Sequence, residues 1–335
     1  MESQLLPEGF RDSLPGLAEK EYRVNSIFFD VMESNGFLLV KPPLMEFEES
    51  LFFLKKDNGD LNSFRLIDPM SQKMLSIRED ITMQVARIAC GSLKSISRPL
   101  RIMYSGEVLR IKNNNLNMSR QSTQIGGEII GIKDYYCENE ITKLIIEILE
   151  KLKIKDFFLS FSLPTLISAL ASDFNLNDSD LNNLKKKFRN KNFSGVEKIS
   201  SELKKVCNIL HLCIGEIKGS IDKIKSYKFP KKTQSEINKY KEIITKLGKE
   251  FPRLKILLDP LEIDELNYHT GITFKIYSSN FKLLFSGGKY LAYDENCIGF
   301  SGFLDNLVIE SKIQISKKKK IFVQFDINKN DKKKL

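Results

Sequence analysis

Residues 121–131 are taken as a β-strand, in which successive side chains point to opposite faces. Gln124 and Glu128 fall on one face of this strand, with Gly126 between them. An amide and a carboxylate at this spacing present donors, acceptors and a negative charge to one small space, and the glycine lets a ligand approach the backbone. A strand with one solvated face would show the same pattern, so the segment alone leaves both interpretations open.

A second polar group stands where a strand gives way to a helix. Asp80 and Thr82 follow an extended stretch at residues 74–77 and mark the start of a helix that ends near residue 87. Aspartate and threonine often cap helices, so the pair alone supports capping as well as it supports a binding role.

The surrounding elements predict an α+β fold, an antiparallel sheet with helices on one side. Helices are expected at 21–35, with Gly36 as a left-handed cap, at 138–152 and at 300–310. Strands are expected at 37–40, 100–111, 121–131, 157–161, 255–258, 267–278 and 282–285, and one more is possible at 321–326. We divide the chain into a core of residues 1–162 and 252–315, a helical inserted module of residues 163–251, and a basic C-terminal segment of residues 316–335.

Composition excludes several classes of protein. The chain has 335 residues, five scattered cysteines and two histidines, which argues against a structural metal site, and we expect no cofactor. We find neither an apolar run long enough to span a membrane nor a secretory signal, and we expect a cytoplasmic location. The net charge of +10 comes mostly from an excess of lysine, and runs of lysine usually form solvated faces or tails. An RNA-binding adaptor that uses the lysine-rich stretches 183–191 and 317–334 remains an alternative.

Several segments, in chain order, resemble the motifs of histidyl-tRNA synthetases. Tyr104-Ser105-Gly106-Glu107 together with residues 120–128 resembles motif 2, and residues 298–306 resemble motif 3. Further similarities fall at residues 36–43 (motif 1), 78–82 (the Arg-Pro-Glu-Gly-Thr turn), 266–271 (the histidine-specific segment) and 286–290 (the Gly-Gly-Arg-Tyr strand). The resemblance covers most of residues 5–310 and implies a class II synthetase-like sheet.

This resemblance also implies a histidine pocket. Asp80 and Thr82, with Gln124 beside them, would hold the ammonium group of histidine, and Glu128 would accept an imidazole N–H. Tyr268 and Tyr290 would enclose the ring, and His269 stands where the synthetases carry a second tyrosine.

The chemistry of adenylation is expected to be absent. The synthetase arginines that stabilise charge on the α-phosphate match Ser105, Asp264 and Asn306 here, and loss of one such group typically costs about 10²–10³-fold in rate. Arg110 and Arg101 lie near the first gap, and Arg120 is retained in the motif 2 loop. Only 29 residues follow motif 3, too few for an anticodon-binding domain, so we expect no tRNA partner.

A histidine pocket without synthetase chemistry resembles the regulatory subunits of ATP phosphoribosyltransferase, which are paralogues of histidyl-tRNA synthetase. Members of that family are not enzymes themselves. They form dimers through motif 1 and assemble into hetero-octamers with a short catalytic subunit, which carries out the first step of histidine biosynthesis. The resemblance therefore implies L-histidine as effector and that catalytic subunit as partner. The alternative is a degenerate histidyl-tRNA synthetase that still forms histidyl-adenylate.

Overall fold

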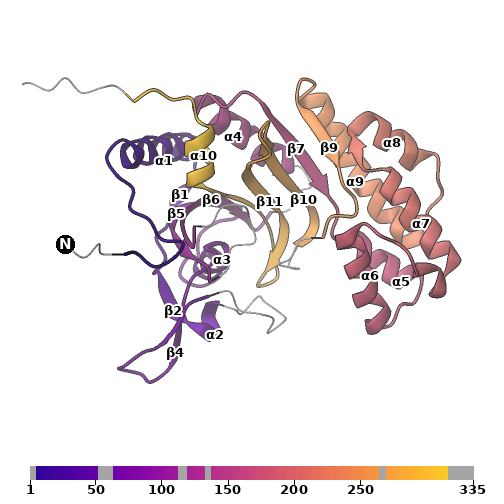
Figure 1. The fold of residues 1–335 in the computed structure, drawn as a ribbon, viewed down its shortest axis with the longest axis horizontal. Coiled ribbons are helices and arrows are strands. Elements are labelled where there is room, and N and C mark those ends of the chain that lie inside the picture. Colours follow the sequence, from indigo (N-terminus) through magenta and orange to yellow (C-terminus); the bar gives the residue numbers. More distant parts are fainter. Residues whose placement is uncertain (1–4, 52–62, 112–118, 133–136, 264–268, 316–335) are drawn as a thin grey trace, which may run out of the picture.

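A nine-stranded sheet forms the centre of the protein, with the strand order β1-β5-β6-β12-β11-β10-β7-β9-β8 (Figure 1). The computed structural model describes residues 5–51, 63–111, 119–132, 137–263 and 269–315. In sheet order the strands are β1 (Leu38–Leu39), β5 (Leu100–Leu109), β6 (Gln121–Ile130), β12 (Glu295–Phe303), β11 (Leu283–Ala292), β10 (His269–Ser278), β7 (Phe157–Ser162), β9 (Lys255–Leu258) and β8 (Gly215–Glu216).

The predicted α+β architecture, a large sheet flanked by helices, is confirmed. Most neighbouring strands are antiparallel, but β1 pairs with β5 and β7 pairs with β9 in parallel. A separate three-stranded sheet, which the sequence analysis missed, has the order β2-β4-β3. Its strands are β2 (Met45–Phe47), β4 (Met74–Ile77) and β3 (Arg65–Ile67).

Helices cover the sheet and extend from one of its ends. The helices outside residues 163–251 are α1 (Leu17–Ser34), α2 (Glu48–Leu51), α3 (Thr82–Cys90), α4 (Cys137–Lys151) and α10 (Leu304–Glu310). Helices α5 (Thr165–Asp173), α6 (Asp178–Asn190), α7 (Ser201–Leu212), α8 (Ile217–Lys225) and α9 (Lys231–Glu250) gather beyond β9, at the right of Figure 1, with a 3-10 helix at Val196–Lys198. As expected, Gly36 adopts a left-handed conformation (φ 79°) after α1.

One predicted helix boundary is wrong. Residues 300–303 belong to strand β12 and not to the final helix, because Phe300 and Gly302 pair with Gly127 and Ile125 of β6. The helix begins only at Leu304. Strand β11 is also longer than predicted and continues to Ala292. The possible strand at 321–326 lies outside the described residues.

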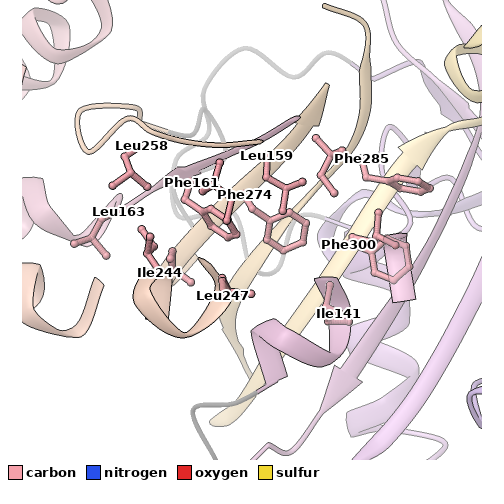
Figure 2. Close-up of a cluster of buried hydrophobic side chains, with 14 of the residues drawn as sticks. Ile141, Leu159, Phe161, Leu163, Ile244, Leu247, Leu258, Phe274, Phe285 and Phe300 are labelled. Carbon is pink, nitrogen blue, oxygen red and sulfur yellow. The ribbon is translucent and has the colours of Figure 1, made fainter. Parts of the chain in front are cut away.

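The main apolar core lies between the sheet and the helices α1, α4, α9 and α10. Figure 2 shows the part in which Phe161 and Phe274 of the sheet lie near Ile244 and Leu247 of α9. The hydroxyl of Tyr240, also on α9, donates a 2.7 Å hydrogen bond to the carbonyl oxygen of Phe161. This bond and the apolar contacts attach the helices of residues 163–251 to the sheet.

Candidate functional site

The carboxyl group of Glu128 is the centre of the candidate site. Glu128 lies on β6 and is only 1% exposed. Each of its two carboxyl oxygens lies close to a tyrosine hydroxyl. Tyr290 donates to Oε2 at 2.8 Å, and Tyr104 donates to Oε1 at 3.3 Å. Gly299, the partner of Glu128 on β12, leaves the space that the carboxyl group fills, since a Cβ at 299 would lie 1.6 Å from Oε2. The local fold is therefore shaped around this carboxyl group.

The environment changes the acidity of this group. Burial raises the pKa of Glu128 to about 8, although hydrogen bonds from Tyr290, Thr82 and Tyr104 lower it in part. At neutral pH the carboxyl group of the ligand-free protein is therefore mostly protonated. A ligand that donates an N–H or carries a positive charge would stabilise the ionised form and bind here.

A hydrogen-bonded turn at the start of α3 forms the other half of the site. Asp80 accepts two hydrogen bonds, from the backbone N–H of Thr82 at 2.8 Å and from the side-chain amide of Gln124 at 2.7 Å. The Gln124 amide oxygen accepts the backbone N–H of Ile81 at 2.8 Å. Asp80 thus binds the first backbone N–H of α3 from the position before the N-cap residue, Ile81, and is also joined to the polar face of β6.

Tyr104 joins the two halves and has no role in the sequence-based site. Its hydroxyl lies 3.1 Å from Oγ1 of Thr82 as well as near Glu128, and the residue is fully buried. It pairs with Gly126, where a Cβ would lie 2.4 Å from the hydroxyl oxygen. The space above Gly126 is therefore filled by Tyr104 and is not open to a ligand. The role of Tyr104 could have been found from the sequence by aligning strand β5 against Gly126, because alternation along β5 then places Tyr104 on the same face as Glu128.

The structure thus connects five of the predicted site residues through hydrogen bonds, directly or through Tyr104. They are Asp80, Thr82, Gln124, Glu128 and Tyr290. His269 lies next to them, because it pairs with Tyr290 across β10 and β11 and its ring is close to Gly288. Tyr268 and Asp264 lie outside the described residues. In the part of the chain that the structure describes, no three His, Cys, Asp or Glu side chains are grouped as metal ligands would be.

Ser105 lies on the face of the sheet opposite to Glu128, and its match to a synthetase arginine stays a prediction. Ser105 pairs with Ile125, whose side chain belongs to the core on the helix-covered face of the sheet. Its neighbour Tyr104 occupies the site face, so Ser105 points away from the site.

The cations near the site differ from the sequence expectation. Arg110 donates two hydrogen bonds, of 3.2 and 3.1 Å, to the carbonyl oxygen of Glu79 beside Asp80, and it lies 4.9 Å from the ring of Phe303. Arg101 instead pairs with Glu140 of α4. Arg110 therefore lies beside the turn that carries Asp80.

Two other motif residues have structural contacts. The guanidinium of Arg120 lies 5.5 Å from the ring of Phe10 and 4.7 Å from that of Phe64, which fixes it between two aromatic rings. Asn306 is 6% exposed on α10, and its amide donates a 2.8 Å hydrogen bond to the carbonyl oxygen of Leu283. Asn306 has no cationic group to offer a phosphate.

Comparison with known proteins identifies the family. The family model for histidyl-tRNA synthetase matches residues 9–307. A curated ATP phosphoribosyltransferase regulatory subunit of Paramagnetospirillum magneticum is 33% identical over 306 residues, which cover 91% of this chain and 81% of that protein. The chain belongs to this family of regulatory subunits.

Solved structures of the family's relatives share the fold. The regulatory subunit/histidyl-tRNA synthetase of Bacillus halodurans C has a TM-score of 0.81 at 21% identity, with 93% of this chain and 84% of that chain covered. A chain of the ATP phosphoribosyl transferase complex of Thermotoga maritima has a TM-score of 0.64 at 18% identity, with 85% and 97% covered. Among the described helices of this regulatory-subunit homologue, none is long and apolar enough to cross a membrane.

Proposed function

We propose that this protein is a non-catalytic, cytoplasmic subunit that binds L-histidine and activates a short ATP phosphoribosyltransferase catalytic subunit. The observation that carries the proposal is the buried carboxyl group of Glu128, connected through Tyr104 and Thr82 to the turn at Asp80. The family membership of the chain and the assembly of its Thermotoga maritima relative support the choice of partner.

The chemistry of the site matches the three polar groups of histidine. Glu128 accepts an imidazole N–H, a bond that lets a buried site reject amino acids without such a donor. Asp80 receives the ammonium group, because it is the carboxylate at the opposite end of the hydrogen-bonded chain. Arg110, held beside Asp80 by Glu79, supplies a cation for the carboxylate of the ligand.

Self-association through motif 1, residues 36–43, is part of the proposal, together with the small sheet that follows it in the sequence. Met45, Phe47 and Leu66 share one face of the β2-β4-β3 sheet and are 41%, 41% and 38% exposed. Leu38 and Leu39 on the edge strand β1 are also exposed, at 56% and 48%. Exposed apolar side chains grouped in this way favour contact with another protein surface. We assign this one to a second copy of the chain, within a hetero-octamer with the catalytic subunit.

The test combines the chain with the short catalytic subunit of the same organism. Phosphoribosyl-ATP formation is measured with each protein alone and with both, and histidine is then titrated. We expect activity only in the mixture and a decline as histidine is added. Activity that is indifferent to the chain would refute the activator role, whereas activity that needs the chain but ignores histidine would refute only the sensor.

A second candidate is a degenerate synthetase that adenylates histidine. The observation that favours it is Arg110, which places one cation beside the turn that carries Asp80 despite the loss expected from the sequence. Pyrophosphate exchange with histidine and ATP separates the two functions. An exchange rate within about tenfold of an authentic synthetase, a difference of about 1.4 kcal/mol in the barrier, would favour the synthetase.

A further inference from the structure

An irregularity in the pairing of β10 and β11 lies next to the candidate site. His269 of β10 pairs with Tyr290, but the next aligned pair is Thr273 with Gly288. Strand β10 therefore advances by four residues where β11 advances by two, and the extra stretch lies opposite the single residue Lys289. Bulges in β-strands often occur beside functional sites, where they turn a side chain toward the site.

The side chains around this bulge point to opposite faces of the sheet. Tyr290 lies on the site face, where its hydroxyl donates a 2.8 Å hydrogen bond to the central carboxyl group. The ring of His269 covers Gly288 on the same face, since a Cβ at 288 would lie 3.0 Å from Cδ2 of His269. Lys289 points the other way, because its partner Ile298 belongs to the core beneath the helices.

The stem of Lys289 fills the bulge from the helix-covered face. A Cβ at Gly271 would lie 3.2 Å from Cβ and 3.4 Å from Cδ of Lys289. The ammonium group of Lys289 pairs at 2.5 Å with Glu138 on the first turn of α4, and the two side chains are 15% and 2% exposed. Because desolvation offsets much of the attraction in a buried ion pair, stability alone does not account for this one.

We propose that Lys289, fixed by Glu138, is a positioning residue that sets the bulge of β10. The bulge in turn holds His269 and Tyr290 at the candidate site. The inference rests on the proposed function, which brings the imidazole ring of histidine to the carboxyl group that Tyr290 contacts. Loss of the ion pair frees the stem of Lys289 to leave the bulge, which then relaxes toward regular pairing. Relaxation moves His269 and Tyr290 together, because they are paired across the two strands.

The pH midpoint of Glu128 reports on the position of Tyr290, because the hydrogen bond from Tyr290 lowers the pKa of Glu128. Thermal melts of the ligand-free protein at several pH values give this midpoint. The other titratable groups that act on Glu128 or respond to its charge are Asp80, Tyr104 and Cys297, and every variant below keeps them. A change in the midpoint is therefore assigned to Tyr290.

The imidazole NMR signal of His269 reports on the bulge itself, again without a ligand. The chain has two histidines, and the second, His211, is exposed on α7 and serves as an internal reference. Calorimetry adds the histidine affinity of each variant as a third readout.

The main variant combines Lys289→Met with Glu138→Gln, which keeps the length of both side chains and leaves no buried charge without its partner. We expect the midpoint to rise by about 0.5–1 pH unit and histidine affinity to fall by about 2–10-fold, the effect of one weakened hydrogen bond. The signal of His269 should shift, and that of His211 should not. Lys289→Arg keeps the cation and should retain the wild-type values.

Two further variants keep the test specific. Glu140→Gln is the matched control, because Glu140 lies on the same helix but pairs at 2.8 Å with Arg101 of β5, and β6 and β12 separate β5 from β11. It should leave the midpoint and the His269 signal unchanged and histidine affinity within about twofold. Gly271→Ala presses a methyl group against Lys289 and should shift the His269 signal with both charges in place.

The outcomes separate the two proposals. A wild type that does not bind histidine would overturn the proposed function, while the midpoint and the His269 signal still decide the positioning role. A wild-type value of either readout in the main variant would overturn that role. Equal changes in Glu140→Gln would overturn it too, since the ion pair would then only support α4.

Discussion

Both faces of strand β6 are buried, but one face is apolar and the other is polar. One face presents Ile125 and Ile129 to the core formed with the helices. The other presents Gln124 and Glu128, each 1% exposed, to the hydroxyl groups of tyrosines and to Asp80. The residues alternate along a single strand, so the same backbone supports both faces.

The difference between the faces separates stability from binding. Burial of Ile125 and Ile129 stabilises the fold directly. Burial of Glu128 costs free energy unless hydrogen bonds compensate, and burial together with the nearby charge of Asp80 raises its pKa against the hydrogen bonds from Tyr290, Thr82 and Tyr104. An apolar side chain of similar size would serve the fold better, which favours a ligand-binding role for Glu128.

The largest effect is expected on the apolar face. Ile129→Ala should lower the free energy of unfolding by about 2–5 kcal/mol, because it leaves a cavity in a fully buried position. Urea denaturation measures this loss. Histidine affinity of the folded protein should stay within about twofold, since Ile129 points away from the site. A large loss of affinity with little loss of stability would contradict the division between the faces.

On the polar face, Glu128→Ala should chiefly affect binding. We expect histidine affinity to fall by about 1–3 kcal/mol, the cost of leaving a buried polar group of the ligand unpaired. Calorimetry without ATP measures this change. Ile129→Ala is the control on the adjacent residue, and unchanged affinity in Glu128→Ala would place the histidine site elsewhere.

Stability should also depend on pH through Glu128. Its pKa is about 8 in the fold against an ordinary value of 4.5, so the folded state holds this proton more tightly than the unfolded state. The stabilisation from the proton is complete below pH 4.5, declines as pH rises, and is lost above pH 8. Compared with Glu128→Gln, the ligand-free wild type should lose at most about 5 kcal/mol between these limits, since the pKa differs by about 3.5 units and each unit corresponds to about 1.4 kcal/mol.

Thermal melts of both proteins at several pH values test this expectation. Parallel pH profiles for the wild type and Glu128→Gln would show that Glu128 does not carry the raised pKa. Histidine should reduce the difference, because an imidazole N–H or imidazolium favours the ionised carboxyl group.

Local pattern was enough to predict most of the elements and the polar face of β6. The alternation at residues 121–131 gave the correct face for Gln124 and Glu128, because strand geometry depends only on neighbouring residues. The start of α3 was also predictable, although the pattern could not show that Asp80 serves both the helix and Gln124.

Contacts between distant segments account for what the sequence analysis missed. Tyr104 becomes a site residue only when β5 is aligned against Gly126, and the same register turns Ser105 away. Residues 300–303 extend β12 because they pair with β6, which no local propensity shows. The contacts of Arg120 with Phe10 and Phe64 likewise join segments far apart in sequence.

The smallest effects are expected when one of two buried tyrosine hydroxyls is removed, one on each face of the sheet. Tyr240→Phe removes the hydrogen bond to the carbonyl oxygen of Phe161, which still accepts the N–H of Asp259 at 2.8 Å. The free energy of unfolding should therefore fall by only about 0.5–1.5 kcal/mol, with no change in histidine affinity.

Tyr104→Phe removes a hydroxyl that lies 3.3 Å from Glu128 and that lowers the pKa of Glu128. The pH transition assigned to Glu128 should move upward, and histidine affinity should change by about 2–10-fold, equal to about 0.4–1.4 kcal/mol. If the two variants changed stability and binding alike, the two faces of the sheet would not have separate roles.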